Sequence, residues 1–146
     1  VDFADGFGLL RGSNTTPVVS SSDPIYGPAV DATHVYWADV HTIKSGEYDT
    51  KIQSAPKAGG TPTTLATFSG SMLPTAVAVD ASHLYWVDGR MKEQCGSIMR
   101  VQKSGGTPEV FASEQDGPHA LVLDAGNVYW TNHSTNHDGQ VMKAAK

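Results

Sequence analysis

Short apolar runs alternate with clusters of turn-forming residues along the chain. The run at 76–79, Ala-Val-Ala-Val, is apolar at every position, which is expected of a strand packed between two neighbouring sheets. A turn-forming Asp-Ala-Ser-His segment follows at 80–83, and the next residues, Leu-Tyr-Trp-Val at 84–87, favour a strand. No segment has apolar positions at helical spacing over a length that competes with this pattern. The pattern predicts an all-β fold of short strands.

The strand-turn-strand pattern recurs three times, and this repeat is the strongest signal in the sequence. It reads Asp-Ala-Thr-His-Val-Tyr-Trp-Ala-Asp at 31–39, Asp-Ala-Ser-His-Leu-Tyr-Trp-Val-Asp at 80–88 and Asp-Ala-Gly-Asn-Val-Tyr-Trp-Thr-Asn at 124–132. A Gly-Gly-Thr-Pro turn follows at 59–62 and again at 105–108. Four strands in a unit of roughly 45 residues are typical of one blade of a β-propeller. The predicted fold class is therefore an all-β β-propeller of four-stranded blades, with three blades per chain.

The third predicted blade lacks a fourth strand. The missing strand has a match at the other end of the sequence, because residues 13–21 align with the fourth-strand segment at 104–112. We therefore expect residues 13–21 to form the strand that completes the last blade. The predicted blades span residues 22–67, 68–112 and 113–146.

Residues 1–12 form an extension ahead of the first predicted strand. A solvated tail rarely carries many large apolar groups, so the extension is interpreted either as a latch on a neighbouring blade or as a frayed terminus. Its large apolar residues are Phe3, Phe7, Leu9 and Leu10.

Three blades leave two apolar faces open, whereas propellers usually have four to eight blades. A two-fold homodimer would give a six-bladed ring, in which residues 16–21 of each chain complete the last blade of the other. The alternative is that the chain is a processed fragment whose partner is the second half of a larger propeller. The predicted partner is therefore either a second copy of this chain or the other half of a larger propeller, and the mass of the assembly in solution distinguishes the two.

The second strand of each repeat carries a family resemblance. Its Tyr-Trp-Ala-Asp, Tyr-Trp-Val-Asp and Tyr-Trp-Thr-Asn sequences resemble the YWTD signature of low-density-lipoprotein-receptor-type propellers, and the Lys-x-Gly-Gly-Thr-Pro turns are similar to those of bacterial propellers of this kind. The resemblance covers about residues 16–146 and departs from the signature at Ala38, Val87 and Asn132. It implies a six-bladed ring, export from the cell and binding to other proteins. A secreted, periplasmic or cell-surface location is therefore expected.

Composition narrows the choice of partners. The 146 residues include 10 Lys and Arg against 15 Asp and Glu, a net charge of −5, so no basic field is present to hold a phosphate backbone and nucleic acid is excluded as a partner. No apolar run approaches the roughly 18 residues that span a bilayer, so we expect no membrane span. Cys95 is the single cysteine, which excludes an internal disulfide and leaves a free thiol or an inter-chain disulfide.

Candidate binding residues come from the loops that share one face of a propeller. These loops are long, unequal and polar, and variable loops on a rigid scaffold usually carry binding. Tyr26, Thr75 and His119 align at the start of the innermost strands, so we expect them to line the mouth of the central channel. The other candidate ligand-binding residues on this face are His41, Tyr48, Arg90, His133 and His137. The loops lie at 22–26, 38–50, 68–74, 87–96, 113–119 and 131–139.

One of these loops holds His133, His137 and Asp138, whose side chains are of the types that bind zinc. Solvated loop histidines are the simpler interpretation, and we therefore predict no metal and no cofactor. His34 and His83 repeat at one turn position, which indicates a structural role. The tryptophans repeat in the same way and are expected to pack between blades; they are Trp37, Trp86 and Trp130.

The sequence shows no Ser-His-Asp arrangement, no paired carboxylates and no phosphate-binding loop. We therefore predict a non-catalytic binding or interaction module that recognises a protein or a glycan through its variable-loop face. The alternative is a propeller enzyme, a lyase or hydrolase, with His119 at the channel mouth and with possible assistance from a metal. A third interpretation is architectural, in which the chain is a repeat segment of a larger surface protein.

Overall fold

The computed structural model describes residues 16–70, 72–90, 95–133 and 139–146. These residues form eleven strands and no helix, which confirms the predicted all-β class. No helix capable of crossing a membrane is therefore found in the described part of the chain. The predicted extension at 1–12 lies outside the described residues.

The strands form three antiparallel sheets, each built from consecutive strands. The first sheet contains β1 (Ile25–Val30), β2 (His34–Lys44), β3 (Glu47–Pro56) and β4 (Thr63–Gly70). The second contains β5 (Met72–Val79), β6 (His83–Arg90), β7 (Cys95–Gln102) and β8 (Glu109–Asp116). The third contains β9 (Pro118–Leu123), β10 (Asn127–His133) and β11 (Gly139–Ala145).

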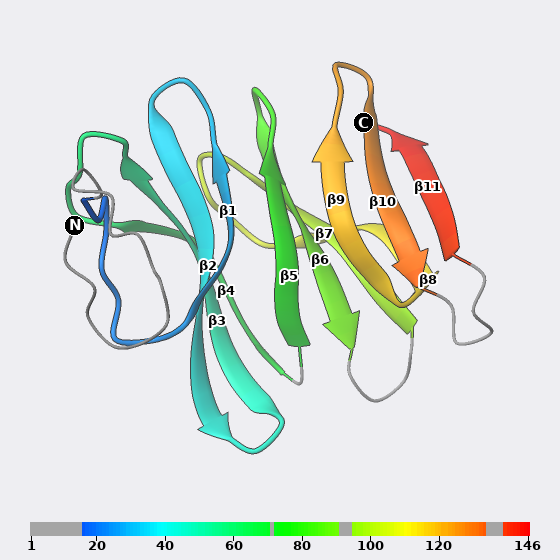
Figure 1. Cartoon of the computed structure of the whole chain (residues 1–146), viewed down its shortest axis with the longest axis horizontal. Coiled ribbons are helices and arrows are strands. Elements are labelled where there is room, and N and C mark those ends of the chain that lie inside the picture. Colours follow the sequence, from blue (N-terminus) through cyan, green and yellow to red (C-terminus); the bar gives the residue numbers. More distant parts are fainter. Residues whose placement is uncertain (1–15, 71, 91–94, 134–138) are drawn as a thin grey trace, which may run out of the picture.

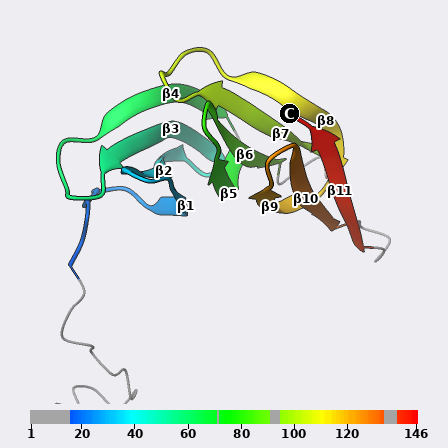
Figure 2. The same cartoon turned by 90° about the horizontal axis from the view of Figure 1, so that it is seen from above.

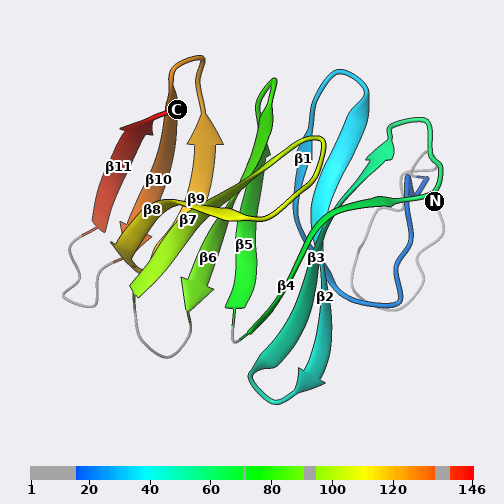
Figure 3. The same ribbon diagram turned by 180° about the vertical axis from the view of Figure 1, so that it is seen from behind.

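The three sheets lie side by side along the long axis of the molecule (Figure 1). Seen from above, they follow a curve, with β1, β5 and β9 on the concave side and β4 and β8 on the convex side (Figure 2). The view from behind shows β4 and β8 crossing the outer surface (Figure 3). The first strand of each sheet contacts the first strand of the next, so β1, β5 and β9 form a continuous concave wall.

The turn between the first two strands of each sheet is built around one aspartate. In the first sheet, Asp31 Oδ1 accepts hydrogen bonds from the backbone N–H groups two and three residues further on, both at 2.8 Å, and Asp31 Oδ2 accepts one from the Tyr36 hydroxyl at 2.7 Å. The equivalent bonds recur around Asp80 and Asp124. Each repeat therefore begins with an aspartate because its carboxylate closes the turn, and has a tyrosine five residues later because the tyrosine hydroxyl donates to the same carboxylate.

Two apolar clusters join the sheets. Between the first and second sheets, Trp86 packs with residues of both and stacks on Phe68, with ring centroids 5.6 Å apart. Between the second and third sheets, Tyr85 and Trp130 belong to the second cluster. Adjacent residues of β6 thus face opposite neighbours, which is why both faces of the strand are apolar. Trp86 and Trp130 pack between sheets, as predicted; Trp37 is also buried but belongs to neither cluster.

Residues 16–24 form no strand in the single chain. Residues 13–15 of the predicted last-blade strand lie outside the described residues, and the third sheet has three strands in the part of the chain that is described. An added strand needs a free sheet edge as its partner. The strand predicted at 13–21 therefore stays a prediction about an assembly.

Candidate functional site

The concave wall presents the three residues that the sequence aligned. Each of them directly follows a residue that pairs with the same position of the second strand in its sheet. These pairs are Ile25 with Asp39, Pro74 with Asp88 and Pro118 with Asn132. Thr75 and His119 are exposed and Tyr26 is half-buried. The Thr75 Oγ1 hydroxyl donates to the carbonyl oxygen of His119 at 2.8 Å, so the second and third sheets are tied together at this level.

Close approach of the inner strands depends on a glycine next to Tyr26. Gly27 has φ = +55°, a conformation that side-chain-bearing residues rarely adopt. A Cβ built on Gly27 would lie 2.8 Å from the backbone nitrogen of Val77 in β5. The glycine therefore lets β1 and β5 approach closely enough to place Tyr26 and Thr75 on one wall.

The loops on this side of the molecule are shorter than the sequence indicated. The predicted loop at 38–50 is mostly a hairpin, because β2 continues to Lys44 and β3 begins at Glu47. Gly46, with φ = +79°, lies in the turn between them. A solvated hairpin pairs through its backbone and has no apolar pattern, so periodicity does not reveal it.

His41 and Tyr48 lie on this hairpin and not on a loop. His41 is exposed, and its Nδ1 lies 2.9 Å from Asp23 Oδ1. Tyr48 pairs in register with Thr42 of β2 and is half-buried. His41 thus connects the segment before β1 to β2.

The remaining predicted site residues are only partly described. His133 ends β10 and is exposed, and Arg90 ends β6 with its side chain outside the described residues. His137 and Asp138 also lie outside them. Among the residues that the structure describes, no three His, Cys, Asp or Glu side chains are close enough to hold a metal ion. The weak metal site at His133, His137 and Asp138 therefore stays an untested interpretation.

The turn histidines lie away from this wall and make local contacts. His34 Nδ1 is 2.8 Å from the hydroxyl of Thr33, and His83 Nδ1 is 2.8 Å from that of Ser82. These equal contacts in two turns agree with a structural role for both histidines.

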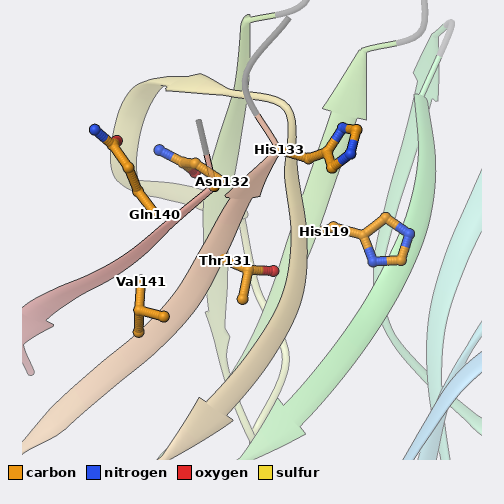
Figure 4. A pocket seen from close by; sticks show the side chains of 7 residues that line it. His119, Thr131, Asn132, His133, Gln140 and Val141 are labelled. Atoms are coloured by element: carbon orange, nitrogen blue, oxygen red, sulfur yellow. The ribbon is translucent and has the colours of Figure 1, made fainter. Parts of the chain in front are cut away.

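A cavity of about 570 Å³ opens on the face of the third sheet that is turned away from the second sheet. His119 borders it from β9, and the close-up view shows the His133 ring on the same side (Figure 4). The sequence indicated these two histidines but missed the remaining wall of the cavity. That wall comprises Thr131 and Asn132 of β10 and Gly139, Gln140 and Val141 of β11.

The equivalent place on the second sheet is filled. Thr131 pairs with Val141, and the matching pair in the second sheet is Val87 with Ile98. Ile98 has no exposed surface, whereas Val141 is 77% exposed. Pro118 of β9 fills the place on the second sheet, because a Cβ built on Gly96 would lie 2.6 Å from its Cγ. The cavity therefore lies at a place on the third sheet whose equivalent on the second sheet is covered by the sheet that follows it.

Ion pairs join neighbouring sheets at the end of the molecule that carries the aspartate turns. Lys103 Nζ lies 2.5 Å from Asp31 Oδ2, and Lys146 Nζ lies 3.2 Å from Asp80 Oδ2. The bond from Lys103 is the main cause that holds the pKa of Asp31 well below its usual range. Burial raises the pKa of Asp80, but hydrogen bonds from two turn N–H groups and from Lys146 outweigh it and lower the pKa to about 2. An ion pair between the turn aspartate of one sheet and a lysine of the next sheet thus occurs at both sheet-to-sheet contacts.

No protein-family model matches this chain, and no curated protein matches it. Solved structures do match: two mutants of the apocarotenoid oxygenase of Synechocystis have TM-scores of 0.59 and 0.60, both at 10% sequence identity over 86% of this chain. A chimera of that oxygenase with RPE65 has a TM-score of 0.57 at 11% identity, again over 86% of this chain. The chain spans 37% of the length of each of these structures.

At such low identity, the likeness concerns the fold alone. The structures named above are mutants or a chimera of an apocarotenoid oxygenase and not YWTD-repeat proteins. Membership of the YWTD family therefore stays a prediction from the sequence.

Proposed function

We propose that the three sheets are blades of a β-propeller and that the chain is a non-catalytic binding module for a protein or a glycan. The single observation that carries the proposal is the concave wall, where Tyr26, Thr75 and His119 occupy one level of three adjacent inner strands. Structural likeness to carotenoid oxygenase-like propellers supports the blade interpretation. A rigid wall with a few convergent polar groups is the usual form of a binding site.

The chemistry of the wall suits a hydroxyl-rich ligand. Tyr26 is half-buried against the apolar cluster between the first and second sheets, and the part of its side chain that remains exposed could stack on the C–H face of a sugar. The exposed Thr75 hydroxyl donates to the His119 carbonyl oxygen and keeps its lone pairs for a ligand donor. The exposed His119 ring supplies a further donor or acceptor. We therefore place an oligosaccharide first among the ligand classes to test.

A glycan microarray followed by calorimetry of the best binder tests this function. We expect Tyr26→Ala and His119→Ala each to weaken binding by about tenfold or more. Thr61→Ala is the matched control, because this exposed residue lies in the Gly-Gly-Thr-Pro turn after β3, away from the start of β1. Equal binding by all four proteins, or no binder on the array, would overturn the glycan assignment.

The enzymatic alternative, a lyase or hydrolase centred on His119, has its own readout. Turnover of a bound oligosaccharide by the wild-type chain, lost in a folded His119→Ala variant, would replace the binding proposal. Export to the periplasm or to the cell surface remains part of the proposal and is tested by fractionation of the native host.

A further inference from the structure

Apolar side chains remain exposed on both end faces of the curved array, although Trp37 on the end face of the first sheet is buried. On the third sheet, Val122 and Val141 are exposed, and on the first sheet Ile25 and Val30 are exposed. The positions that match them in the second sheet lie at its contacts with its neighbours, as Ile98 does with no exposed surface. Exposed apolar faces of this kind mark interaction sites. Each end face therefore has the character of a sheet-to-sheet interface.

The two end faces are complementary in shape. The cavity beside Val141 matches the place on the second sheet that Pro118, the first residue of β9, fills. Ile25 is the first residue of β1 and has the same register position as Pro118, because it pairs with Asp39 as Pro118 pairs with Asn132. Ile25 is 41% exposed, so one end of the chain carries the apolar group that the other end lacks.

The two end faces are also complementary in charge. The backbone N–H of Lys57 donates to the carbonyl oxygen of Thr33 at 2.9 Å. In the other two sheets, the backbone N–H of Lys103 donates in the same way to Ser82, and that of Lys146 donates to Gly126. Lys57 is therefore the first-sheet equivalent of the two lysines that cross to a neighbouring aspartate. It is exposed, and in the described part of the chain its side chain has no ion pair.

The matching aspartate is in the third sheet. The Asp124 carboxylate accepts bonds from its turn and from the Tyr129 hydroxyl at 2.7 Å. Lys146 Nζ donates to the backbone carbonyl oxygen of Asp124 at 2.6 Å, but the Asp124 carboxylate has no ion pair among the described residues. Asp31 and Asp80 have the same local bonds and in addition a lysine from the next sheet. Lys57 and Asp124 are thus the two unmatched members of a repeated pair.

A third feature concerns the segment ahead of β1. The carbonyl oxygen of Val18 lies 3.7 Å from the position of a Cβ on Gly59, in the turn after β3. At the matching turn of the second sheet, the carbonyl oxygen of Leu65 in β4 lies 3.1 Å from the position of a Cβ on Gly105. Val18 therefore lies beside this turn of the first sheet as Leu65 of β4 lies beside the turn of the second, while β11 pairs only with β10 among the described strands.

We propose that a second copy of this chain docks on both end faces at once and closes a ring. In each of the two identical contacts, Ile25 of one copy fills the cavity beside Val141 of the other, and Lys57 of one copy pairs with Asp124 of the other. Residues 16–20 then add to the free edge of β11 in the other copy. The two-fold arrangement uses each face once and leaves none open. This inference rests on the blade interpretation and not on ligand binding, so the two fail separately.

Charge reversal tests the assembly by sedimentation velocity at low salt. The wild-type chain is expected at twice its mass of 15.5 kDa. Lys57→Glu and Asp124→Lys each place like charges at both contacts, and each is expected to weaken self-association by about tenfold or more. Mixing these two variants restores opposite charges at both contacts, so the mixture should recover the dimer that neither variant forms alone. Lys44→Glu, at the far end of β2, is the matched control and should sediment as wild type.

Two further variants keep the test decisive if Asp124→Lys fails to fold. Asp124→Asn keeps an oxygen for the turn N–H groups, and removes the charge together with the oxygen that accepts the Tyr129 hydroxyl. Gly139→Leu fills the cavity, and nothing lies within 4 Å of a Cβ at Gly139 in the single chain, so the variant should fold normally and remain monomeric. A monomeric wild-type chain overturns the proposal in favour of a non-identical partner or further blades. A dimer that is indifferent to Lys57→Glu and Gly139→Leu places the contact elsewhere and also overturns it.

Discussion

The side chain of Lys103 in the second sheet crosses to the first and places its Nζ 2.5 Å from Asp31 Oδ2. The two residues are 72 positions apart, so the pair is a contact between sheets. The same ammonium lies 5.5 Å from the centre of the Tyr36 ring. The Lys103 ammonium of the second sheet thus contacts both the aspartate turn of the first sheet and the tyrosine whose hydroxyl bonds to that turn.

Removing Lys103 should destabilise the chain more than removing an ordinary surface lysine. We expect Lys103→Met to lower the free energy of unfolding by roughly 1–3 kcal/mol, because Asp31 loses its ion pair while it remains partly buried. Lys44→Met is the control: Lys44 forms an exposed pair with Glu47, and its loss should cost under about 0.5 kcal/mol. Urea unfolding followed by tryptophan fluorescence measures both. Equal effects would show that the inter-sheet pair adds nothing.

Stability should fall in acid over a defined range. The folded pKa of Asp80 is about 2, below the ordinary aspartate value of 3.8, so its contribution is complete above pH 3.8 and is lost as the pH falls towards about 2. The lowered pKa of Asp31 extends the loss to lower pH. We expect the melting temperature, followed by circular dichroism, to drop between pH 4 and pH 2.

Asp80→Asn provides the comparison for this acid effect. The amide oxygen still accepts the turn N–H bonds, but the ionisable group and its pair with Lys146 are gone. The variant should be less stable than wild type at neutral pH and should lose less stability between pH 4 and pH 2. Parallel curves for the two proteins would contradict the assignment of the acid sensitivity to Asp80.

Two equivalent glycines should differ in how much the same substitution lowers the stability of the folded chain. A Cβ on Gly96 would lie 2.5 Å from the carbonyl oxygen of Asp88 and 2.6 Å from Pro118, so Gly96→Ala must shift backbone and should cost about 2 kcal/mol or more. Gly139 occupies the matching position of the third sheet with nothing within 4 Å, and Gly139→Ala should be nearly neutral for the folded monomer. Dilute samples in chemical denaturant separate this effect from association.

Cys95 should react as a free thiol in the folded chain. It is exposed at the start of β7, so a chromogenic disulfide reagent is expected to titrate one thiol per chain without denaturant. Non-reducing electrophoresis should show a single band at the mass of one chain. A band at twice this mass that disappears on reduction would instead support the inter-chain disulfide.

The repeat made much of the fold predictable because its signals are local. The turn aspartate bonds to N–H groups two and three residues away, and the apolar residues on both faces of β6 report a strand covered on both sides. The alignment of Tyr26, Thr75 and His119 followed from the same register. By contrast, the sequence predicts a loop at 38–50 where β2 and β3 form a hairpin, because solvated strands carry no apolar pattern.

The sequence by itself determined most of the strands, the aspartate turns and the order in which the strands of each sheet pair, since these depend on contacts between residues near one another in the chain. Only the tertiary structure decided which lysine meets which aspartate and which apolar positions stay uncovered. Ile98 and Val141 occupy equal places in the repeat, yet one is fully buried and the other is 77% exposed. The difference comes from whether another sheet lies against the strand, and no local pattern can encode that.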